Sequence, residues 1–326
     1  MSKKTLLMVL IGFSLGIFIP ISVVAIDGSY DIYGDKSDST VLQAIEETVG
    51  IYKTSSNSTI AEVIDEPFGI YEDWSSPNIR SDRWLVRTDR AHEARREVLG
   101  HHVIMRYRLE GLTTSNSGLV GAMQAFRVSN PLAINKIEVN FQVKDCDVIG
   151  CVENPTNTRI RPAAISLSKF NDGSSTGPGD LKGDHFVRVM ANREAFTTDP
   201  VGMLTVQAFL FRCIDAVCSN AYSNVFDLNV GKVMVAEPFS LRISWDESNN
   251  RFLVGYNNRG HCGHHDQNSP DVILEYNPLL NQKPPGGPFA DFHIQLVNAS
   301  CVAGPTVTDA EIKVREVYTN VSAIIP

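Results

Sequence analysis

Apolar and polar residues alternate along most of this chain, and the alternation is clearest between residues 238 and 256. Apolar side chains occupy every second position from Phe239 to Trp245, which is the period of a strand with one buried face. A turn-forming run, Glu-Ser-Asn-Asn, follows, and the alternation resumes up to Tyr256. This stretch therefore predicts a β-hairpin.

The same period of two recurs on both sides of the hairpin, and no helical period separates the segments. Strands without intervening helices pair antiparallel and bury their apolar faces in two stacked sheets. The fold class that we expect is all-β, an antiparallel two-sheet β-sandwich of the jelly-roll type. The other predicted strands are Phe68–Trp74, Arg83–Arg87, Val98–Leu109, Leu119–Val128, Asn135–Lys144, Arg159–Phe170, His185–Asn192, Met203–Cys213, Val272–Tyr276, Phe289–Asn298 and Ala310–Tyr318.

The first 25 residues have the pattern of a signal peptide. Lys3 and Lys4 precede an apolar run from Leu6 to Ala25, and small residues before Ile26 suit cleavage there. The alternative is an uncleaved membrane anchor, because the run approaches the roughly 20 residues that span a bilayer. Gly12, Gly16 and Pro20 favour cleavage. Either way, we expect the rest of the chain to be exported.

Residues 26–65 predict an N-terminal extension and not a domain. Loop-forming residues surround one short helical pattern, Val41–Val49, which Ser39 or Thr40 would cap. The sandwich domain is then expected to cover residues 66–326. The chain as a whole is acidic, with 29 Lys and Arg against 37 Asp and Glu, a net charge of −8. This balance argues against a nucleic-acid partner, and membrane contact is expected only if the N-terminal segment is uncleaved.

Six cysteines agree with export to an oxidising compartment. Two pairs share the spacing C-x4-C, and each lies where a strand pattern ends. The economical pairing is two short bridges and one long one, although six cysteines allow fifteen connectivities and zinc is a competing interpretation of the short pairs. We therefore expect disulfides between Cys146 and Cys151, between Cys213 and Cys218, and between Cys262 and Cys301.

Three segments resemble the concanavalin A-like, laminin-G-like jelly-roll superfamily. Glu72-Asp73-Trp74 with Arg83-Trp84 is similar to its opening strand motif, and the 241–252 hairpin is similar to its central one. The segment Ala310–Tyr318 resembles the closing strand that pairs near the first. The resemblance implies the sandwich fold, which serves lectins, adhesion modules, glycoside hydrolases and polysaccharide lyases alike.

The catalytic patterns of the enzymes with this fold are missing. Glycosidases of the family carry E-x-D-x-x-E on one strand, and the nearest string here, Glu62 to Glu66, has another spacing and precedes the sandwich. Arg95-Arg96-Glu97 only loosely resembles the basic strand of alginate lyases. His293-Ile294-Gln295 reverses their Gln-Ile-His, and we interpret these as ordinary strand residues. We therefore assign no catalytic residue.

Two loops offer metal ligands, and each has a simpler interpretation. Three histidines and an aspartate lie within His261–Asp266 and could ligate Zn²⁺ or Cu²⁺, although solvent-exposed histidines in a long surface loop are the commoner explanation. Asp172, Asp180 and Asp184 lie in or beside a Gly- and Ser-rich loop and are weak candidates for calcium, the one cofactor that the sequence suggests. A solvated connection is the simpler interpretation, because the spacing matches no fixed calcium loop.

A long polar connection follows the central hairpin and is the ligand site that the sequence favours. Its amides, guanidinium and imidazole can hydrogen-bond sugar hydroxyls, while a tyrosine at its base offers a stacking face or packs in the core. We expect a non-catalytic exported binding or surface-structural protein with carbohydrate as ligand; a polysaccharide-cleaving enzyme of the same fold is the alternative. The candidate binding residues are Tyr256, Asn257, Asn258, Arg259 and His264.

Overall fold

The computed structural model describes the sandwich and leaves the N-terminal region aside. The predicted signal peptide, the extension and its short helix all lie outside the described residues. The described residues are 69–89, 91–115, 118–155, 157–218, 222–249, 251–257, 272–275 and 284–321.

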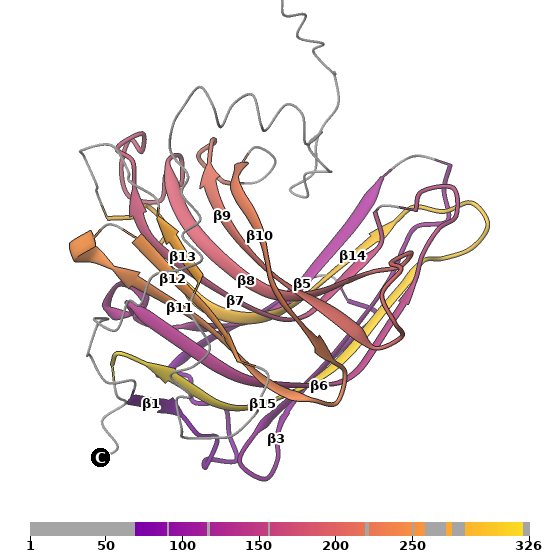
Figure 1. Cartoon of the computed structure of the whole chain (residues 1–326), viewed down its shortest axis with the longest axis horizontal. Coiled ribbons are helices and arrows are strands. Elements are labelled where there is room, and N and C mark those ends of the chain that lie inside the picture. The colour runs from indigo at the N-terminus through magenta and orange to yellow at the C-terminus, as the bar shows by residue number, and fades with distance from the viewer. Residues whose placement is uncertain are drawn as a thin grey trace, which may run out of the picture. The chain divides into compact units, whose positions relative to one another are not determined.

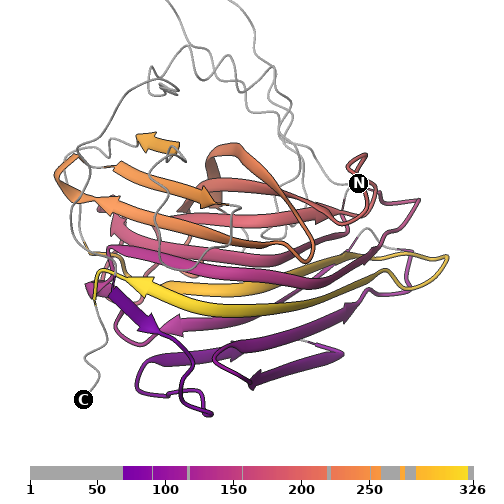
Figure 2. The same cartoon turned by 60° about the horizontal axis from the view of Figure 1, so that its bottom comes forward.

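Two antiparallel sheets form the domain, as the alternation predicts (Figures 1 and 2). The eight-stranded sheet has the order β13-β12-β11-β6-β15-β4-β3, with β1 also paired to β15. Its strands are β1 (Gly69–Glu72), β3 (Glu93–Val98), β4 (Val103–Glu110), β6 (Lys136–Ile149), β11 (Pro238–Asp246), β12 (Arg251–Asn257), β13 (Val272–Glu275) and β15 (Val307–Thr319).

The seven-stranded sheet has the order β10-β9-β8-β7-β14-β5-β2. It is curved, and the face turned away from the other sheet is its concave side (Figure 1). Its strands are β2 (Trp84–Thr88), β5 (Leu119–Val128), β7 (Arg159–Asn171), β8 (Asp184–Glu194), β9 (Met203–Cys213), β10 (Tyr222–Met234) and β14 (Ala290–Ala299). Two 3-10 turns, Pro131–Ala133 and Glu247–Asn249, are too short to cross a membrane, and no helix of the described residues is long and apolar enough to do so.

The core lies between the sheets and is built from the inward positions of the alternation. Phe141 of β6 meets Phe292 of β14 at 6.3 Å between ring centroids, and Phe170 of β7 meets Trp245 of β11 at 5.2 Å. These contacts join one sheet to the other. All the inward residues predicted for β6, Ile137, Val139, Phe141 and Val143, are buried.

The opening motif closes one side of this core. Glu72 is buried and accepts hydrogen bonds from the Trp74 backbone and from the Trp84 indole, both at 3.2 Å. The two indoles stack with centroids 5.8 Å apart. Strand β1, which carries Glu72, pairs with the closing strand β15, as the family resemblance implies.

The structure departs from the predicted strands at the β3–β4 turn, at β10 and at the end of β6. The predicted strand Val98–Leu109 begins five residues too early: Val98 ends β3 and β4 begins at Val103, because Gly100 and His101 both have positive φ and turn the chain between them. The sequence pattern did not predict strand β10. Strand β3 was missed because its residues are exposed on both faces of an edge strand, so no apolar alternation marks it.

Candidate functional site

Polar side chains gather on the outer face of the seven-stranded sheet. Strand register places Arg127, Asp291, Ser166 and Arg188 in one row across β5, β14, β7 and β8, with Phe209 of β9 next. The neighbouring rows contain His293 between two alanines and Gln295 opposite Arg161. We call this surface the concave face, and its residues are Arg127, Arg161, Ser166, Phe186, Arg188, Phe209, Phe211, Asp291, His293 and Gln295.

A buried imidazole and a buried carboxylate form the centre of the concave face. His293 is fully buried, and its Nδ1 lies 2.9 Å from Asp291 Oδ1. Burial would raise the pKa of Asp291, but His293, Arg127 and Arg188 hold it below its usual value. Burial lowers the pKa of His293. The imidazole is therefore neutral and the carboxylate charged.

These protonation states decide which atom of His293 is free to bind. Because the charged Asp291 can only accept, Nδ1 carries the proton and donates it to the carboxylate. Nε2 is then an acceptor with a lone pair. It has no hydrogen-bond partner among the described residues. A buried acceptor without a partner costs free energy, so its presence needs an explanation, and a ligand hydroxyl would supply the missing donor.

Arg188 extends over the same face within a neutral frame. Its Nε donates to Ser166 Oγ at 3.1 Å, and its Nη1 donates to Gln295 Oε1 at 3.4 Å. The guanidinium carbon lies 5.7 Å and 5.8 Å from the ring centroids of Phe186 and Phe211. Hydroxyl, amide and aromatic contacts therefore position this arginine.

Two further arginines of the concave face contact Gln295 and Asp291. Arg161 Nη1 donates to Gln295 Oε1 at 2.6 Å, so Gln295 accepts from both arginines beside it. Arg127 Nη2 lies 3.9 Å from Asp291 Oδ2, and its guanidinium lies 5.2 Å from the ring centroid of Phe289. The face thus combines charged donors, a neutral acceptor and aromatic surface.

An aromatic cluster connects the concave face to the loops at one end of the sheet. Phe186 lies 4.9 Å from Phe211 and 5.3 Å from Phe289 between ring centroids. Leu181 and the disulfide Cys213–Cys218 pack against this cluster. The loops at this end are therefore anchored to the same rings that frame Arg188.

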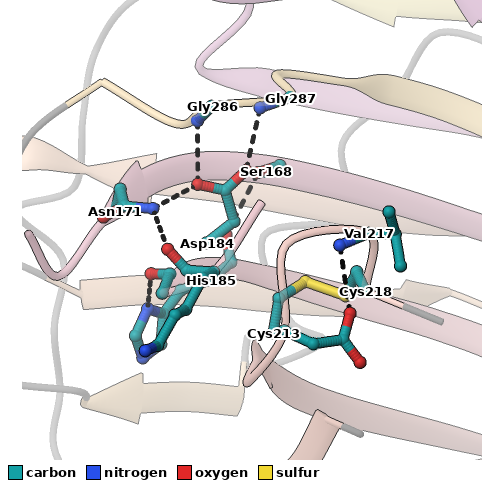
Figure 3. Close-up of a disulfide and its surroundings, with 12 residues drawn as sticks. Ser168, Asn171, Asp184, His185, Cys213, Val217, Cys218, Gly286 and Gly287 are labelled. Carbon is teal, nitrogen blue, oxygen red and sulfur yellow. Dashed lines mark hydrogen bonds between the residues drawn. A yellow bond between two sulfur atoms is a disulfide. The ribbon is translucent and has the colours of Figure 1, made fainter. Parts of the chain in front are cut away.

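Asp184 fixes the loop end by accepting from three donors (Figure 3). Asn171 Nδ2 and the Gly286 backbone N–H donate to its Oδ1, at 2.6 and 2.8 Å, and the Gly287 N–H donates to Oδ2 at 2.9 Å. A Cβ at Gly286 would lie 2.0 Å from the Asp180 carbonyl oxygen, which explains the glycine there. Asp184 thus ties the 284–289 segment to the start of β8.

The other two calcium candidates also point at protein donors. Asp172 accepts from Arg212 Nε at 2.6 Å, and Asp180 accepts from the Thr176 N–H at 2.7 Å and from the Lys182 N–H at 3.0 Å. Among the described residues, Asp172, Asp180 and Asp184 do not bring their oxygens together within 4.8 Å of one another. A shared cation would require these hydrogen bonds to be replaced.

The loop that the sequence favoured is described only at its base. The half-buried ring of Tyr256 packs against the core beside Gly231, and its hydroxyl donates to the Lys232 carbonyl. Asn257 ends β12. The other residues of this prediction, Asn258, Arg259 and His264, lie outside the described residues, as does the whole His261–Asp266 cluster. Sugar stacking on Tyr256 therefore stays a prediction.

Cysteine pairing differs from the prediction in two of three bridges. Cys213–Cys218 is confirmed, but Cys151 pairs with Cys301, so the expected Cys146–Cys151 and Cys262–Cys301 bridges are wrong. Strand β6 continues to Ile149, and three extended residues carry the chain about 10 Å beyond Cys146, which is too far to bridge back.

Cys146 is consequently a free thiol, and burial raises its pKa to about 12, so it stays protonated. Cys262 lies outside the described residues.

The two segments that were compared with lyase motifs lie on different sheets. Arg95-Arg96-Glu97 lies in the edge strand β3 of the eight-stranded sheet, whereas His293 and Gln295 lie on the concave face. Interpreting His293-Ile294-Gln295 as ordinary strand residues overlooked this cluster. The available signal was that the alternate residues Asp291, His293 and Gln295 are all polar in a strand that is buried along its whole length.

Comparisons with known proteins find structural but no sequence relatives. No family model matches the chain, and no curated protein matches it. The VIP36 exoplasmic/lumenal domain in a Ca²⁺/Man-bound form is similar at 10% identity, covering 81% of this chain and 93% of its own, with a TM-score of 0.32. Lectin I-B4 from Griffonia simplicifolia is similar at 13% identity, with 72% and 94% covered and a TM-score of 0.28.

The winged bean acidic lectin, in complex with methyl-α-D-galactose, is a third similar structure, at 11% identity with 77% and 95% covered and a TM-score of 0.28. Likenesses this distant assign no residue of the site. The strand order itself makes the fold a two-sheet jelly roll, as the resemblance to the concanavalin A-like superfamily implied.

Proposed function

We propose that this protein is an exported, non-catalytic carbohydrate-binding module whose glycan lies on the concave face. The observation that carries the proposal is the neutral, buried His293, whose Nε2 acceptor has no partner among the described residues. A sugar presents hydroxyl groups that both donate and accept, and apolar ring faces that pack on aromatic side chains. Nε2, the Arg188 guanidinium and the phenylalanine rings offer one partner for each.

Export is part of the same proposal. Two disulfides among the described residues suit an oxidising compartment, and the Lys3–Ala25 pattern suits a cleaved signal peptide. The intact mass of protein recovered from the exported fraction tests this: a mature chain starting at or near Ile26 supports cleavage. A mass that includes residues 1–25 would favour a membrane anchor instead.

A polysaccharide-cleaving enzyme is the alternative, because His293, Gln295 and two arginines share the concave face. Binding is favoured over cleavage for two reasons. Strands β5, β7, β8, β9 and β14 contain no tyrosine that could serve as a lyase acid/base. Asp291, the one carboxylate in the central rows, is held by His293 and has no second carboxylate in its row to complete a glycosidase pair.

A glycan-array screen of the mature protein, combined with an assay for released sugar ends, tests both functions. His293→Asn keeps a donor toward Asp291 and removes the Nε2 acceptor. We expect it to weaken binding of an array hit about 3- to 10-fold, the size of one lost hydrogen bond. His102→Asn, in the β3–β4 turn, is the matched control and should leave binding unchanged.

The outcomes separate the candidate sites. If His293→Asn binds normally while Arg259→Ala or His264→Ala weakens binding, the glycan lies on the loop after β12 and not on the concave face. Release of new sugar ends would support the enzyme. A screen without any bound glycan rejects the proposed function. Repeating the binding measurement with a chelator tests whether calcium is required, since loss of binding would establish that a cation is needed.

A further inference from the structure

The central strands of the seven-stranded sheet carry an excess of positive charge. Strands β5, β7 and β9 contain no Asp or Glu, β14 contains Asp291, and β8 contains Asp184 and Glu194 at its two ends. Against these three acids stand seven basic residues of the same five strands: Arg127, Arg159, Arg161, Lys169, Arg188, Arg193 and Arg212. The excess is local, because the chain has a net charge of −8.

Arg188 is the arginine whose donors are arranged for a ligand. Among the described residues, no carboxylate lies within 4 Å of its guanidinium, and its Nη2 donates to no residue. Ser166 and Gln295 accept from its Nε and Nη1, so the hydrogens of Nη2 are left for a partner. Guanidinium N–H donors of this kind match the oxygens of a carboxylate.

The arginines of the other sheet make a different arrangement. Arg106 lies 3.4 Å from Glu93 and 3.2 Å from Asp309, and Arg108 lies 3.1 Å from Glu110. We call this surface the charged face, and its residues are Glu93, Arg95, Glu97, Arg106, Arg108, Glu110 and Asp309. Carboxylates of the chain itself neutralise these arginines, so they need no outside anion.

We propose that the glycan of the concave face bears carboxylates, as in a uronic-acid polymer, and that Arg188 holds one of them. This inference rests on the proposed function and narrows its ligand class. A carboxylate and a sulfate can each accept from two guanidinium N–H groups, so the experiment below includes a sulfated ligand to distinguish the two anions. His293 Nε2 then accepts from a hydroxyl of the same sugar or its neighbour, and the rings of Phe186 and Phe211 lie beside the guanidinium that holds the carboxylate.

Titration calorimetry of the full mature chain tests the inference with matched ligands. The ligands are oligogalacturonate, oligomannuronate and oligoglucuronate, each beside its methyl ester, which keeps the sugar and removes the charge. A sulfated galactan oligomer is included to distinguish recognition of a sulfate from recognition of a carboxylate. We expect at least one uronate to bind, its methyl ester to bind about tenfold or more weakly, and added salt to weaken the acid form selectively.

Variants of Arg188 test whether this residue contacts the carboxylate of the uronate. Arg188→Gln should lower the affinity for the uronate about tenfold or more. Arg188→Lys, which keeps the charge but not the planar guanidinium, should recover part of this loss of affinity. Arg108→Gln on the charged face is the matched control and should leave affinity unchanged. Melting temperatures within a few degrees of the wild type establish that the variants are folded, and if Arg188→Gln unfolds, the Lys variant serves as the comparison.

Each remaining outcome has a separate meaning. If an ester binds as tightly as its acid, or if only neutral glycans of the array bind, this inference fails and the carbohydrate-binding function stands. Tighter binding of the sulfated oligomer than of every uronate overturns the carboxylate assignment. If no glycan of any class binds, the proposed function itself fails.

Discussion

The outer faces of the two sheets both carry arginines, and the two surfaces use them differently. On the charged face, Arg106 lies between Glu93 and Asp309, and Arg95 pairs with Glu97 at 2.7 Å. On the concave face, Arg188 rests on a hydroxyl, an amide and two phenylalanine rings. The first arrangement satisfies charge within the protein. The second holds a charged donor in place without neutralising it, as a binding surface requires.

The largest expected difference between the faces is the cost of removing one aspartate. Asp291→Asn leaves Arg127 without its buried counter-charge and weakens the bond to His293, so we expect the free energy of unfolding to fall by about 3 kcal/mol or more. Asp309→Asn, whose arginine partners are more than a third exposed, should cost about 1 kcal/mol or less. Urea denaturation measures both. Equal losses would mean that the two faces do not differ in this respect.

Acid should destabilise the seven-stranded sheet through its buried histidines. Burial lowers the pKa of His185 to about 4, and its Nδ1 lies 2.9 Å from the Gly183 carbonyl oxygen. The unfolded chain takes up a proton near its ordinary pKa of about 6.5, but the folded chain does not until about pH 4. Stability is therefore complete above about pH 6.5 and falls by about 3 kcal/mol as the pH drops to about 4.

Denaturation curves across that pH window, for the wild type and for His185→Leu, isolate this contribution. The variant should lose the extra slope even if it is less stable at neutral pH. The same slope in both proteins would show that His185 is protonated in the folded state, contrary to the burial argument.

The smallest effect is expected at an exposed ion pair of the charged face. Arg95 and Glu97 lie in the edge strand β3, and their side chains are 61% and 36% exposed. Because solvent and salt screen such a pair, Arg95→Ala should change the free energy of unfolding by about 0.5 kcal/mol or less. Chemical denaturation at low and high salt checks this value. A loss above about 1 kcal/mol would indicate that the ion pairs of this face act as a network.

Local alternation predicted most of the fold. Strands such as Leu119–Val128 and Met203–Cys213 were predicted with the observed bounds, because each buries one face and ends in turn-forming residues. The β3–β4 turn was missed, since Leu99 continues the apolar pattern through it. The pairing Cys151–Cys301 could not be derived from spacing, because it depends on where β6 ends and on which connections meet in space.

The candidate site was invisible for a related reason. Arg188 and Gln295 are 107 positions apart, and Arg161 and Gln295 are 134 apart. Each residue alone is an ordinary polar position on a strand. They share one surface only because the sheet order places β14 beside β7 and β7 beside β8, and a single sequence does not specify non-local pairing.

The disulfide between Cys151 and Cys301 determines what happens to the chain after proteolytic cleavage. It closes a loop of 150 positions that includes β7 to β14, and thus most of the concave face. A protease that hydrolyses one peptide bond anywhere inside this loop leaves both fragments covalently joined. Such a nicked protein would keep its full mass, apart from one added water, under oxidising conditions, and it would separate into two pieces only when reduced.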